Sequence, residues 1–341
     1  LPRGLTTGGL MSTVALVALA RPTFDLACAQ ANFDSARALL TQLGATVVGP
    51  SELVMTVEDV AAVQLPHADL HILFMASFSD ASPAVELLGK VKGPVLGWSM
   101  REPGAVGDRL KLNSMCGVNL AAHALMNAGQ SIRHIHGNAD EPQVRAAIKD
   151  ALAGKLPEAS APKTVSGEFG SEADAQKALD WLRGKKIGAV GEAPIGFTPC
   201  IYDAKQIFST FGLDIRQISI DDAFGRISEV KEEARELAYA SAVAAQPSLA
   251  AVNVAEAKKV YGVEVALDAW RKEEVLDAIA IRCWPEFPTD LGACICSSLG
   301  RLSDRGTVTT CERDVLGAVT MMVCESLGSD ENYLVDIVDL D

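Results

Sequence analysis

The chain has 341 residues, of which 49% are hydrophobic and only 5% aromatic, and its formal net charge is −14. A single hydrophobic core seldom grows beyond about 250 to 300 residues, so this length predicts at least two domains. The negative charge repels a phosphate backbone, and no Lys/Arg run interleaved with aromatic residues opposes it, so nucleic acid is disfavoured as a partner.

The first apolar run, residues 13–20, reads TVALVALA and is far shorter than the roughly 20 residues that span a bilayer. We predict a buried strand here and no association with a membrane. Residues 1–10 are interpreted as the remnant of an expression tag and are left out of the fold argument. The eight cysteines show no CxxC spacing, which indicates reduced thiols in a cytoplasmic protein.

Two segments repeat the order strand, loop, helix, strand. In the first, the strand over residues 13–20 precedes a helix that we expect to begin after Asn32 and to stop at Gly44. In the second, a strand over residues 185–190 precedes a helix between Ala204 and Phe211. Such units form parallel sheets with helices on both faces. The predicted fold class is therefore α/β, with two doubly wound, Rossmann-like domains.

The domain limits follow from these units and from one segment of biased composition. Residues 152–173 are rich in Pro, Ala, Ser and Gly and are predicted to link an N-terminal domain, residues 11–151, to a second domain, residues 174–330. Residues 331–341 are predicted to be a strand that starts a truncated C-terminal domain, because the chain stops inside an apolar run. Further strands are expected over residues 68–75, 94–99, 131–137, 277–284 and 307–311.

Glu312 follows the strand candidate TVTTC and precedes an apolar helix. Ligands of open α/β sheets collect beyond the carboxyl ends of the strands, so this carboxylate is expected at a ligand-binding rim. An acid in the first turn of a helix also complements the helix dipole, and the motif alone does not separate these two readings.

Asp336, in YLVDIVD, has apolar neighbours on both sides and is expected in a covered strand. A buried carboxylate needs a partner, which could be an arginine, a backbone amide or a metal. Two acids at the rim of adjoining strands suit Mg²⁺ or Mn²⁺ and could also exchange protons with a bound substrate.

The segment RCWPEF, residues 282–287, ends another predicted strand. Arg282 offers a fork for an anionic or hydroxyl group, Trp284 an apolar face for a sugar ring, and Glu286 a further acceptor. Together they predict a sugar-sized pocket, although a tryptophan before proline more often packs than binds a ligand. Arg101 and Glu102 follow the same logic, or they pair with each other.

Two other pairs have metal-ligand character. His134 and His136 alternate on a predicted strand, but no third ligand has a convincing spacing, so surface histidines are favoured over a zinc pair. Cys294 and Cys296 share one face of a probable strand, and buried core thiols are favoured over a metal site. No glycine cluster matches a dinucleotide or P-loop fingerprint, so nucleotide cofactors are disfavoured.

The segments TCERDVLGAVTMMVCESLG and YLVDIVDLD, with AIRCWPEF upstream and REPGAV in the first domain, resemble the L-fucose isomerase-like family of aldose–ketose isomerases. The order and approximate spacing hold over most of residues 12–341. The resemblance implies one Mn²⁺ or Mg²⁺ per active site and no nucleotide or organic cofactor. It implies that Glu312 and Asp336 bind the metal and form the acid/base pair. A third ligand, a histidine, is expected beyond residue 341.

The activity implied by the resemblance is a metal-dependent sugar isomerisation, an intramolecular oxidoreduction through a cis-enediol. Substrates within the family are deoxysugars, pentoses and sulfonated sugars such as sulfoquinovose. The resemblance also implies a homo-oligomer, often a hexamer, in which Phe78, Trp98 and Arg101 contact the neighbouring subunit. The alternative is a non-catalytic cytoplasmic sugar-binding module, because two α/β domains can flank a ligand-binding cleft.

Overall fold

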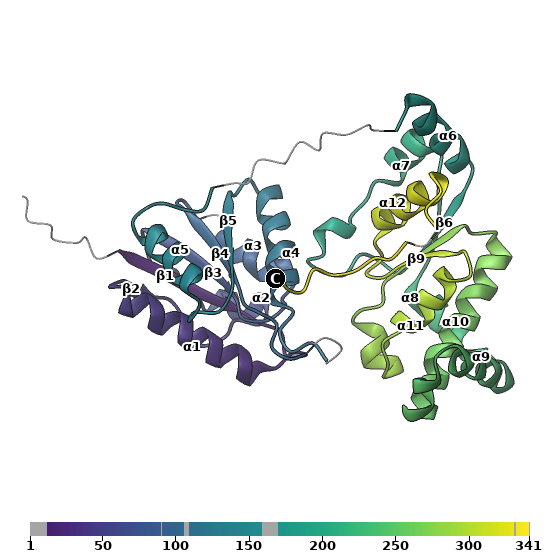
Figure 1. Ribbon diagram of the computed structural model, residues 1–341, viewed down its shortest axis with the longest axis horizontal. Helices are drawn as coiled ribbons and strands as arrows, with labels where there is room; N and C mark the ends of the chain where they lie inside the picture. The colour runs from purple at the N-terminus through teal and green to yellow at the C-terminus, as the bar shows by residue number, and fades with distance from the viewer. Residues whose placement is uncertain (1–11, 90, 106–108, 159–169, 331, 341) are drawn as a thin grey trace, which may run out of the picture. The chain divides into compact units, whose positions relative to one another are not determined.

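The structure is a computed structural model that describes residues 12–89, 91–105, 109–158, 170–330 and 332–340. The chain divides into two compact units, one made of Leu1–Val165 with Asp336–Asp341 and the other of Ser166–Val335. Each unit is a parallel sheet covered by helices on both faces, which confirms the prediction of two doubly wound α/β units (Figure 1). The division falls inside the predicted linker, of which residues 159–169 lie outside the described residues. The predicted tag, residues 1–10, also lies outside them.

The first unit is built on a five-stranded parallel sheet in the order β2-β1-β3-β4-β5. Its strands are β1 (Thr13–Leu19), β2 (Thr46–Val48), β3 (Leu70–Met75), β4 (Val95–Ser99) and β5 (Ile132–His136). The order reverses between β1 and β3, and open α/β sheets bind ligands beyond their carboxyl ends near such a switch point. The rim at the carboxyl ends of these strands is therefore the place to look for a site.

Helices cover both faces of this sheet. One face is covered by α1 (Leu26–Gln42) and α5 (Pro142–Leu152), the other by α2 (Val57–Ala61), α3 (Ala81–Leu88) and α4 (Ser114–Asn127). Burial on both sides explains why the strands are almost continuously apolar in sequence. Asp25 caps α1 by accepting a hydrogen bond from the Cys28 N–H at 3.0 Å, so the predicted start after Asn32 is too late.

The second unit has a four-stranded parallel sheet in the order β7-β6-β8-β9. Its strands are β6 (Lys186–Val190), β7 (Asp214–Ile218), β8 (Ala278–Ile281) and β9 (Val308–Thr310). One face packs against α6 (Glu172–Leu182), α7 (Ala204–Phe211) and α12 (Val315–Ser326), the other against α8 (Ile220–Ser228), α10 (Val254–Glu274) and α11 (Cys296–Ser303). The remaining helices are η1 (Thr198–Cys200), α9 (Glu232–Ala245), which packs on α10, η2 (Pro247–Ala251) and η3 (Phe287–Leu291).

Gly188 of β6 allows Trp270 of α10 to lie directly on the second sheet. A Cβ at this position would lie 2.6 Å from the Trp270 ring and 2.6 Å from Leu276 Cδ1. Because the core is close-packed, we expect Gly188→Ala to lower the free energy of unfolding by about 1–3 kcal/mol, measured by urea denaturation. Gly225→Ala in α8 is the matched control, since nothing lies within 4 Å of its Cβ position and alanine favours the helix. Equal losses for both variants would contradict the packing argument.

The last described segment, residues 332–340, contains no helix or strand, and Asp336 is exposed. The prediction of a covered strand over this segment is therefore wrong for these residues. Its apolar side chains lie largely in solvent, with Val335 64% and Ile337 54% exposed. A β-forming sequence adopts a strand only where a neighbouring strand pairs with it, and no such pairing is present for the described residues of this segment. A C-terminal domain that starts here stays a prediction.

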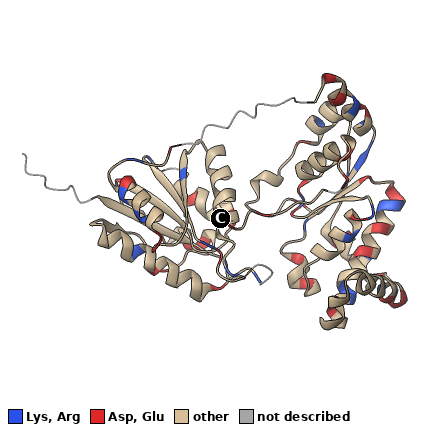
Figure 2. Cartoon of the chain, viewed as in Figure 1, with Lys and Arg blue, Asp and Glu red and all other residues tan. Residues whose placement is uncertain are grey.

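Charged residues of both signs are interspersed along the helices of each unit (Figure 2). Within the part of the chain that the structure describes, no helix is both long enough and apolar enough to cross a membrane.

Candidate functional site

Glu312 lies in the turn between β9 and α12, at the carboxyl end of the second sheet (Figure 1). Asp314 caps the helix by accepting a hydrogen bond from the Gly317 N–H at 2.7 Å. The first turn of α12, which is described in full, carries no acidic residue. Glu312 therefore does not serve as a first-turn acid for the helix dipole, and its half-buried carboxylate lies at the rim where α/β sheets bind ligands.

The backbone of this turn is strained. Glu312 and Arg313 both lie in the left-handed region, with φ of 55° and 56°. Each such non-glycine residue costs on the order of 1–3 kcal/mol, and strain of this kind concentrates at functional sites. The turn is held by hydrogen bonds from the Arg313 N–H to the Ile281 carbonyl, at 2.9 Å, and from the Glu312 N–H to Cys283 Sγ, at 3.5 Å.

The Cys283 thiol contacts the Glu312 carboxylate, and the Cys200 thiol lies close enough to be affected by its charge. Cys283 donates its S–H to Glu312 Oε1 across 3.6 Å. The hydrogen bond with Cys311, burial and the charge of Glu312 all raise the pKa of the Cys283 thiol, so this group stays protonated. Burial, followed by the charges of Asp314 and Glu312, raises the pKa of Cys200 to about 12. The Cys283 and Cys200 thiols are therefore protonated near neutral pH and do not act as bases, whereas Glu312 supplies a carboxylate beside them.

Arg313 is a residue that the sequence argument missed. It is 6% exposed, and its guanidinium lies 4.9 Å from the centre of the Tyr202 ring. It donates hydrogen bonds to the Tyr202 hydroxyl at 3.2 Å and to Gln217 Oε1 at 3.3 Å. The signal in the sequence that could have indicated Arg313 as a site residue is its position directly after Glu312. It places a fixed positive charge in the same strained turn.

The predicted sugar-binding residues follow β8. Arg282 Nε donates to Glu286 Oε2 at 2.9 Å, and a second contact joins Arg282 Nη2 to Glu286 Oε1. Two of the three residues therefore satisfy each other, four positions apart in the loop after β8. Trp284 is half-buried and precedes a cis proline, Pro285. Binding of a sugar by these residues stays a prediction.

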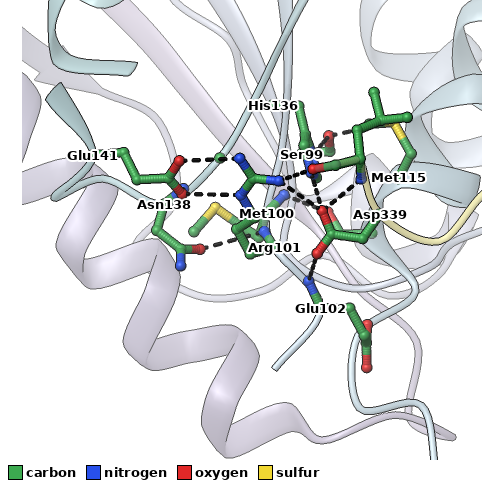
Figure 3. Close-up of polar contacts among 12 residues, drawn as sticks. Ser99, Met100, Arg101, Glu102, Met115, His136, Asn138, Glu141 and Asp339 are labelled. Carbon is green, nitrogen blue, oxygen red and sulfur yellow. Dashed lines mark hydrogen bonds and ion pairs between the residues drawn. The ribbon is translucent and has the colours of Figure 1, made fainter. Parts of the chain in front are cut away.

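A second polar cluster lies at the carboxyl ends of β4 and β5 in the first unit. Figure 3 shows the Arg101 guanidinium with Glu141 on one side and Asp339 on the other. Arg101 Nε and Nη2 each lie 3.3 Å from a Glu141 oxygen, and Nη1 lies 3.0 Å from Asp339 Oδ1. His136 Nε2 lies 2.6 Å from the same Asp339 oxygen. This cluster brings together residues more than 200 positions apart in the sequence.

Glu102 does not pair with Arg101, which excludes one of the alternatives raised by the sequence. Its carboxylate accepts hydrogen bonds from three successive backbone N–H groups ahead of α4, those of Lys111, Leu112 and Asn113. Its own N–H donates to Asp339 Oδ2 at 2.8 Å. The two neighbouring charged residues thus have separate partners.

His134 and His136 both contact Ser99 of the adjacent strand. Ser99 Oγ lies 2.8 Å from His134 Nε2 and 2.8 Å from His136 Nδ1. Neither histidine is exposed, so the prediction of surface histidines is wrong. The reason is the register between β4 and β5, which pairs Ser99 with His136. The fully buried Ser99 hydroxyl contacts both histidine rings and keeps them from the surface. Burial, and then the charge of His136, lowers the pKa of His134 to about 4.

The low pKa of His134 predicts a pH-dependent stability. Between pH 6.5, the ordinary value, and about 4, the unfolded chain binds a proton at this histidine that the folded chain does not. The stability that the neutral His134 contributes to the fold is therefore complete above pH 6.5. It is lost as the pH falls towards 4, and the free energy of unfolding drops by about 3 kcal/mol in total. We expect His134→Gln to flatten this part of the profile of unfolding free energy, measured with urea between pH 4 and 7.5. The exposed His123→Gln is the control and should leave the profile as it is in the unaltered protein.

Comparison with known proteins identifies relatives over almost the whole chain. A sulfoquinovose isomerase of Alkalicoccus urumqiensis is 30% identical over 333 residues, which cover 96% of this chain and 70% of that protein. The chain belongs to the sulfoquinovose isomerase family. Sulfoquinovose isomerases of Priestia megaterium and of a Clostridium species are 28% identical over 337 and 333 residues, covering 97% and 96% of this chain and 70% and 69% of the relatives. No family model matches the chain.

Membership of the sulfoquinovose isomerase family confirms the relationship to sugar isomerases that the motifs indicated. The wider L-fucose isomerase-like grouping is not named by these relatives and stays a prediction. Isomerase is the class that the relatives carry. The expectation of an intramolecular oxidoreductase is wrong as an enzyme class: the expected reaction belongs with the isomerases, since hydrogen would move within one sugar and not between two substrates.

The Mn²⁺ or Mg²⁺ ion predicted for this chain needs several side chains as ligands. Within the described residues, no group of three or more His, Cys, Asp and Glu side chains could hold a metal ion. Glu312 belongs to the second unit and Asp336 to the first. The Glu312 carboxylate contacts the protonated Cys283 thiol, whereas Mn²⁺ and Mg²⁺ prefer oxygen ligands. The described residues do not form a metal site by themselves, and an ion shared by Glu312 and Asp336 stays a prediction.

Two of the three residues predicted to contact a neighbouring subunit are buried within the first unit. Trp98 is 0% exposed, and its indole N–H donates to the Gly137 carbonyl at 2.9 Å. Phe78 is 7% exposed and lies beside Phe24, with ring centres 6.0 Å apart. These aromatic side chains fill the core of the unit and present almost no surface, which gives a contact with a neighbouring subunit no support, and that contact stays a prediction for both. Arg101, with 30% of its side chain exposed, stays a candidate.

The prediction of buried core thiols is wrong for Cys294 and Cys296. Both are exposed, and they lie before and at the start of α11 instead of on a strand. The alternation that suggested a strand is too short to separate a strand from a helix start. None of the eight cysteines, all of which lie in the described part of the chain, forms a disulfide bond.

Proposed function

We propose that this protein isomerises a sulfonated aldose, such as sulfoquinovose, to the corresponding ketose. The observation that carries the proposal is the 30% identity over 96% of the chain with a sulfoquinovose isomerase. The strained rim of the second sheet supports it, because Glu312 there is a half-buried carboxylate held by a thiol donor. The substrate, the direction of the reaction and the residue roles are all parts of the proposal.

The proposed chemistry is a proton shift between two neighbouring carbons. The Glu312 carboxylate accepts the proton of C2 while the carbonyl oxygen O1 gains a proton, which gives a cis-enediol. The O2 hydroxyl then loses its proton, and Glu312 returns its proton to C1 to give the ketose. We assign the transfer between O1 and O2 to Asp336. The S–H of Cys283 would keep Glu312 Oε1 oriented without changing the net charge.

Mn²⁺ or Mg²⁺ is retained as the proposed cofactor, and such an ion would polarise the sugar oxygens when bound. A homo-oligomer is likewise part of the proposal. Chelation with EDTA, followed by return of each ion separately, tests the metal dependence.

The experiment is an assay of the protein with Mn²⁺ and sulfoquinovose in deuterated water, followed by nuclear magnetic resonance. We expect a ketose that carries deuterium at C1, because the proton on a carboxylate exchanges with solvent. Glucose is the matched neutral sugar and should react far more slowly. Equal rates for both sugars would overturn the assignment of a sulfonated substrate. Binding of sulfoquinovose without any ketose, with either ion, would overturn the isomerase and favour the non-catalytic sugar-binding module.

A further inference from the structure

The Asp339 carboxylate is held at the carboxyl ends of β4 and β5 in the manner of a bound anion (Figure 3). Its Oδ1 lies 3.0 Å from Arg101 Nη1 and 2.6 Å from His136 Nε2, and its Oδ2 accepts the Glu102 N–H at 2.8 Å. The N–H of Leu340 also donates to Oδ1, at 2.7 Å. Burial raises the pKa of this carboxyl, but the donated hydrogen bonds outweigh burial and hold the pKa at about 2. The position therefore favours a full negative charge.

Arg101 is fixed by residues of the first unit other than Asp339. Its Nε and Nη2 are held by the two oxygens of Glu141, and its N–H donates to Asn138 Oδ1 at 3.3 Å. Glu141 is fixed in turn by the Asn138 N–H at 2.6 Å. The free edge of the guanidinium, at Nη1, is the edge that contacts Asp339. A guanidinium prepared in this way matches the geometry of an oxyanion.

The other two donors are equally prepared. The side chain of His136 is 8% exposed and is held by Ser99 at 2.8 Å from Nδ1, which directs Nε2 towards Asp339. The Glu102 N–H is fixed because the Glu102 carboxylate binds the N–H groups of residues 111–113. Three donors from three different groups thus converge on one point at the rim of the sheet, where α/β proteins bind ligands.

The segment that carries Asp339 has few other attachments. Residues 336–340 form no helix or strand, and Ile337 and Leu340 are 54% and 53% exposed. One further contact joins Arg101 Nη1 to the Leu340 carbonyl. The carboxylate can therefore leave the donors at a small cost compared with unfolding of the unit.

We propose that Arg101, His136 and the Glu102 amide form a binding site for a sulfonate-type oxyanion, which Asp339 occupies as an intramolecular competitor. A sulfonate group offers three oxygens, one for each donor, whereas the Asp339 carboxylate offers two. The charges of Glu141 and Glu102 do not oppose such a ligand strongly, because each is already bound to its own donors. The site lies entirely within the first unit and does not depend on the proposed isomerisation at Glu312.

Isothermal titration calorimetry with sodium methanesulfonate tests the site. Asp339→Ala removes the competitor and should bind methanesulfonate at least about tenfold more tightly than the unaltered chain, a change of about 1.4 kcal/mol. Adding Arg101→Met to Asp339→Ala should abolish this gain. Asp330→Ala, an exposed acid, is the matched control for the change of net charge and should leave the affinity unchanged.

The outcomes separate the possible ligands. If sulfoquinovose binds more tightly than methanesulfonate and glucose does not bind, the ligand of the site is a sulfonated sugar. If sulfate binds as tightly as sulfoquinovose, the ligand is a free anion. Far-ultraviolet circular dichroism checks that each variant folds. If Arg101→Met does not fold, Arg101→Lys keeps the charge but loses the fork, and a several-fold loss of affinity is expected. Affinity that is the same with and without Asp339, or that survives the change at Arg101, would overturn the proposal.

Discussion

Replacement of Glu312 by glutamine is expected to lower the rate of sugar isomerisation by about 10² to 10⁴-fold. Glutamine keeps the shape of the side chain and can still accept the Cys283 S–H, which lies 3.6 Å from Oε1 in the unaltered protein. It cannot accept the proton of C2. The loss should appear in kcat, with the dissociation constant of the sugar changed only a few-fold, because the sugar loses a base and keeps its other contacts. Deuterium incorporation at C1 should fall in proportion.

Glu233→Gln is the matched control for this variant. Glu233 lies on α9 of the second unit and is exposed, away from the turn that carries Glu312, so the rate should remain unchanged. Full activity of Glu312→Gln would remove Glu312 from the role of base. If Glu312→Gln loses sugar binding or folding together with activity, Glu312 instead has a structural role in the strained turn, where its φ is 55°. Measurement of binding and of urea denaturation separates these outcomes.

The architecture could be predicted because parallel strands that are buried on both faces consist of nearly continuous apolar residues. TVALVALA and KKIGAV became β1 and β6, and the glycines at Gly44 and Gly212 adopt positive φ after the helices, as expected for helix ends. The last segment has the same apolar character and forms no strand in residues 332–340. The difference is tertiary, because a strand needs a partner edge that composition does not reveal.

The surroundings of the candidate residues could not be predicted in the same way. The position of Glu312 at a sheet rim follows from strand order, but its contact with Cys283 depends on how β8 lies beside β9. Likewise, Ser99 meets both His134 and His136 only because of the register between β4 and β5. Side chains that meet across strands are specified by packing and register, for which the spacing along a single chain carries little signal.

The Trp98→Ala variant is expected to lower the free energy of unfolding of the first unit by about 3–5 kcal/mol. Trp98 is fully buried, and its ring meets Phe74 edge-on with centres 5.2 Å apart. Truncation leaves a cavity beneath the sheet and removes the hydrogen bond to the Gly137 carbonyl. Trp98→Phe should cost less, because most of the apolar volume remains and only the N–H donor is lost. Hydrogen exchange of the β4 and β5 amides reports on this unit separately from the second one.

Trp181→Ala provides the comparison, since Trp181 is 39% exposed and Lys185 lies 3.9 Å from the centre of its ring. Its replacement should change the unfolding free energy by about 1 kcal/mol or less. Sedimentation of each variant distinguishes the core position of Trp98 from the subunit contact that the family resemblance implied. A residue in the core loses stability at every protein concentration, whereas a contact between subunits loses association. Trp98→Ala could instead fold with unchanged exchange protection and dissociate an oligomer. Burial of Trp98 within the first unit would not explain that result, and the packing described around β4 would be contradicted.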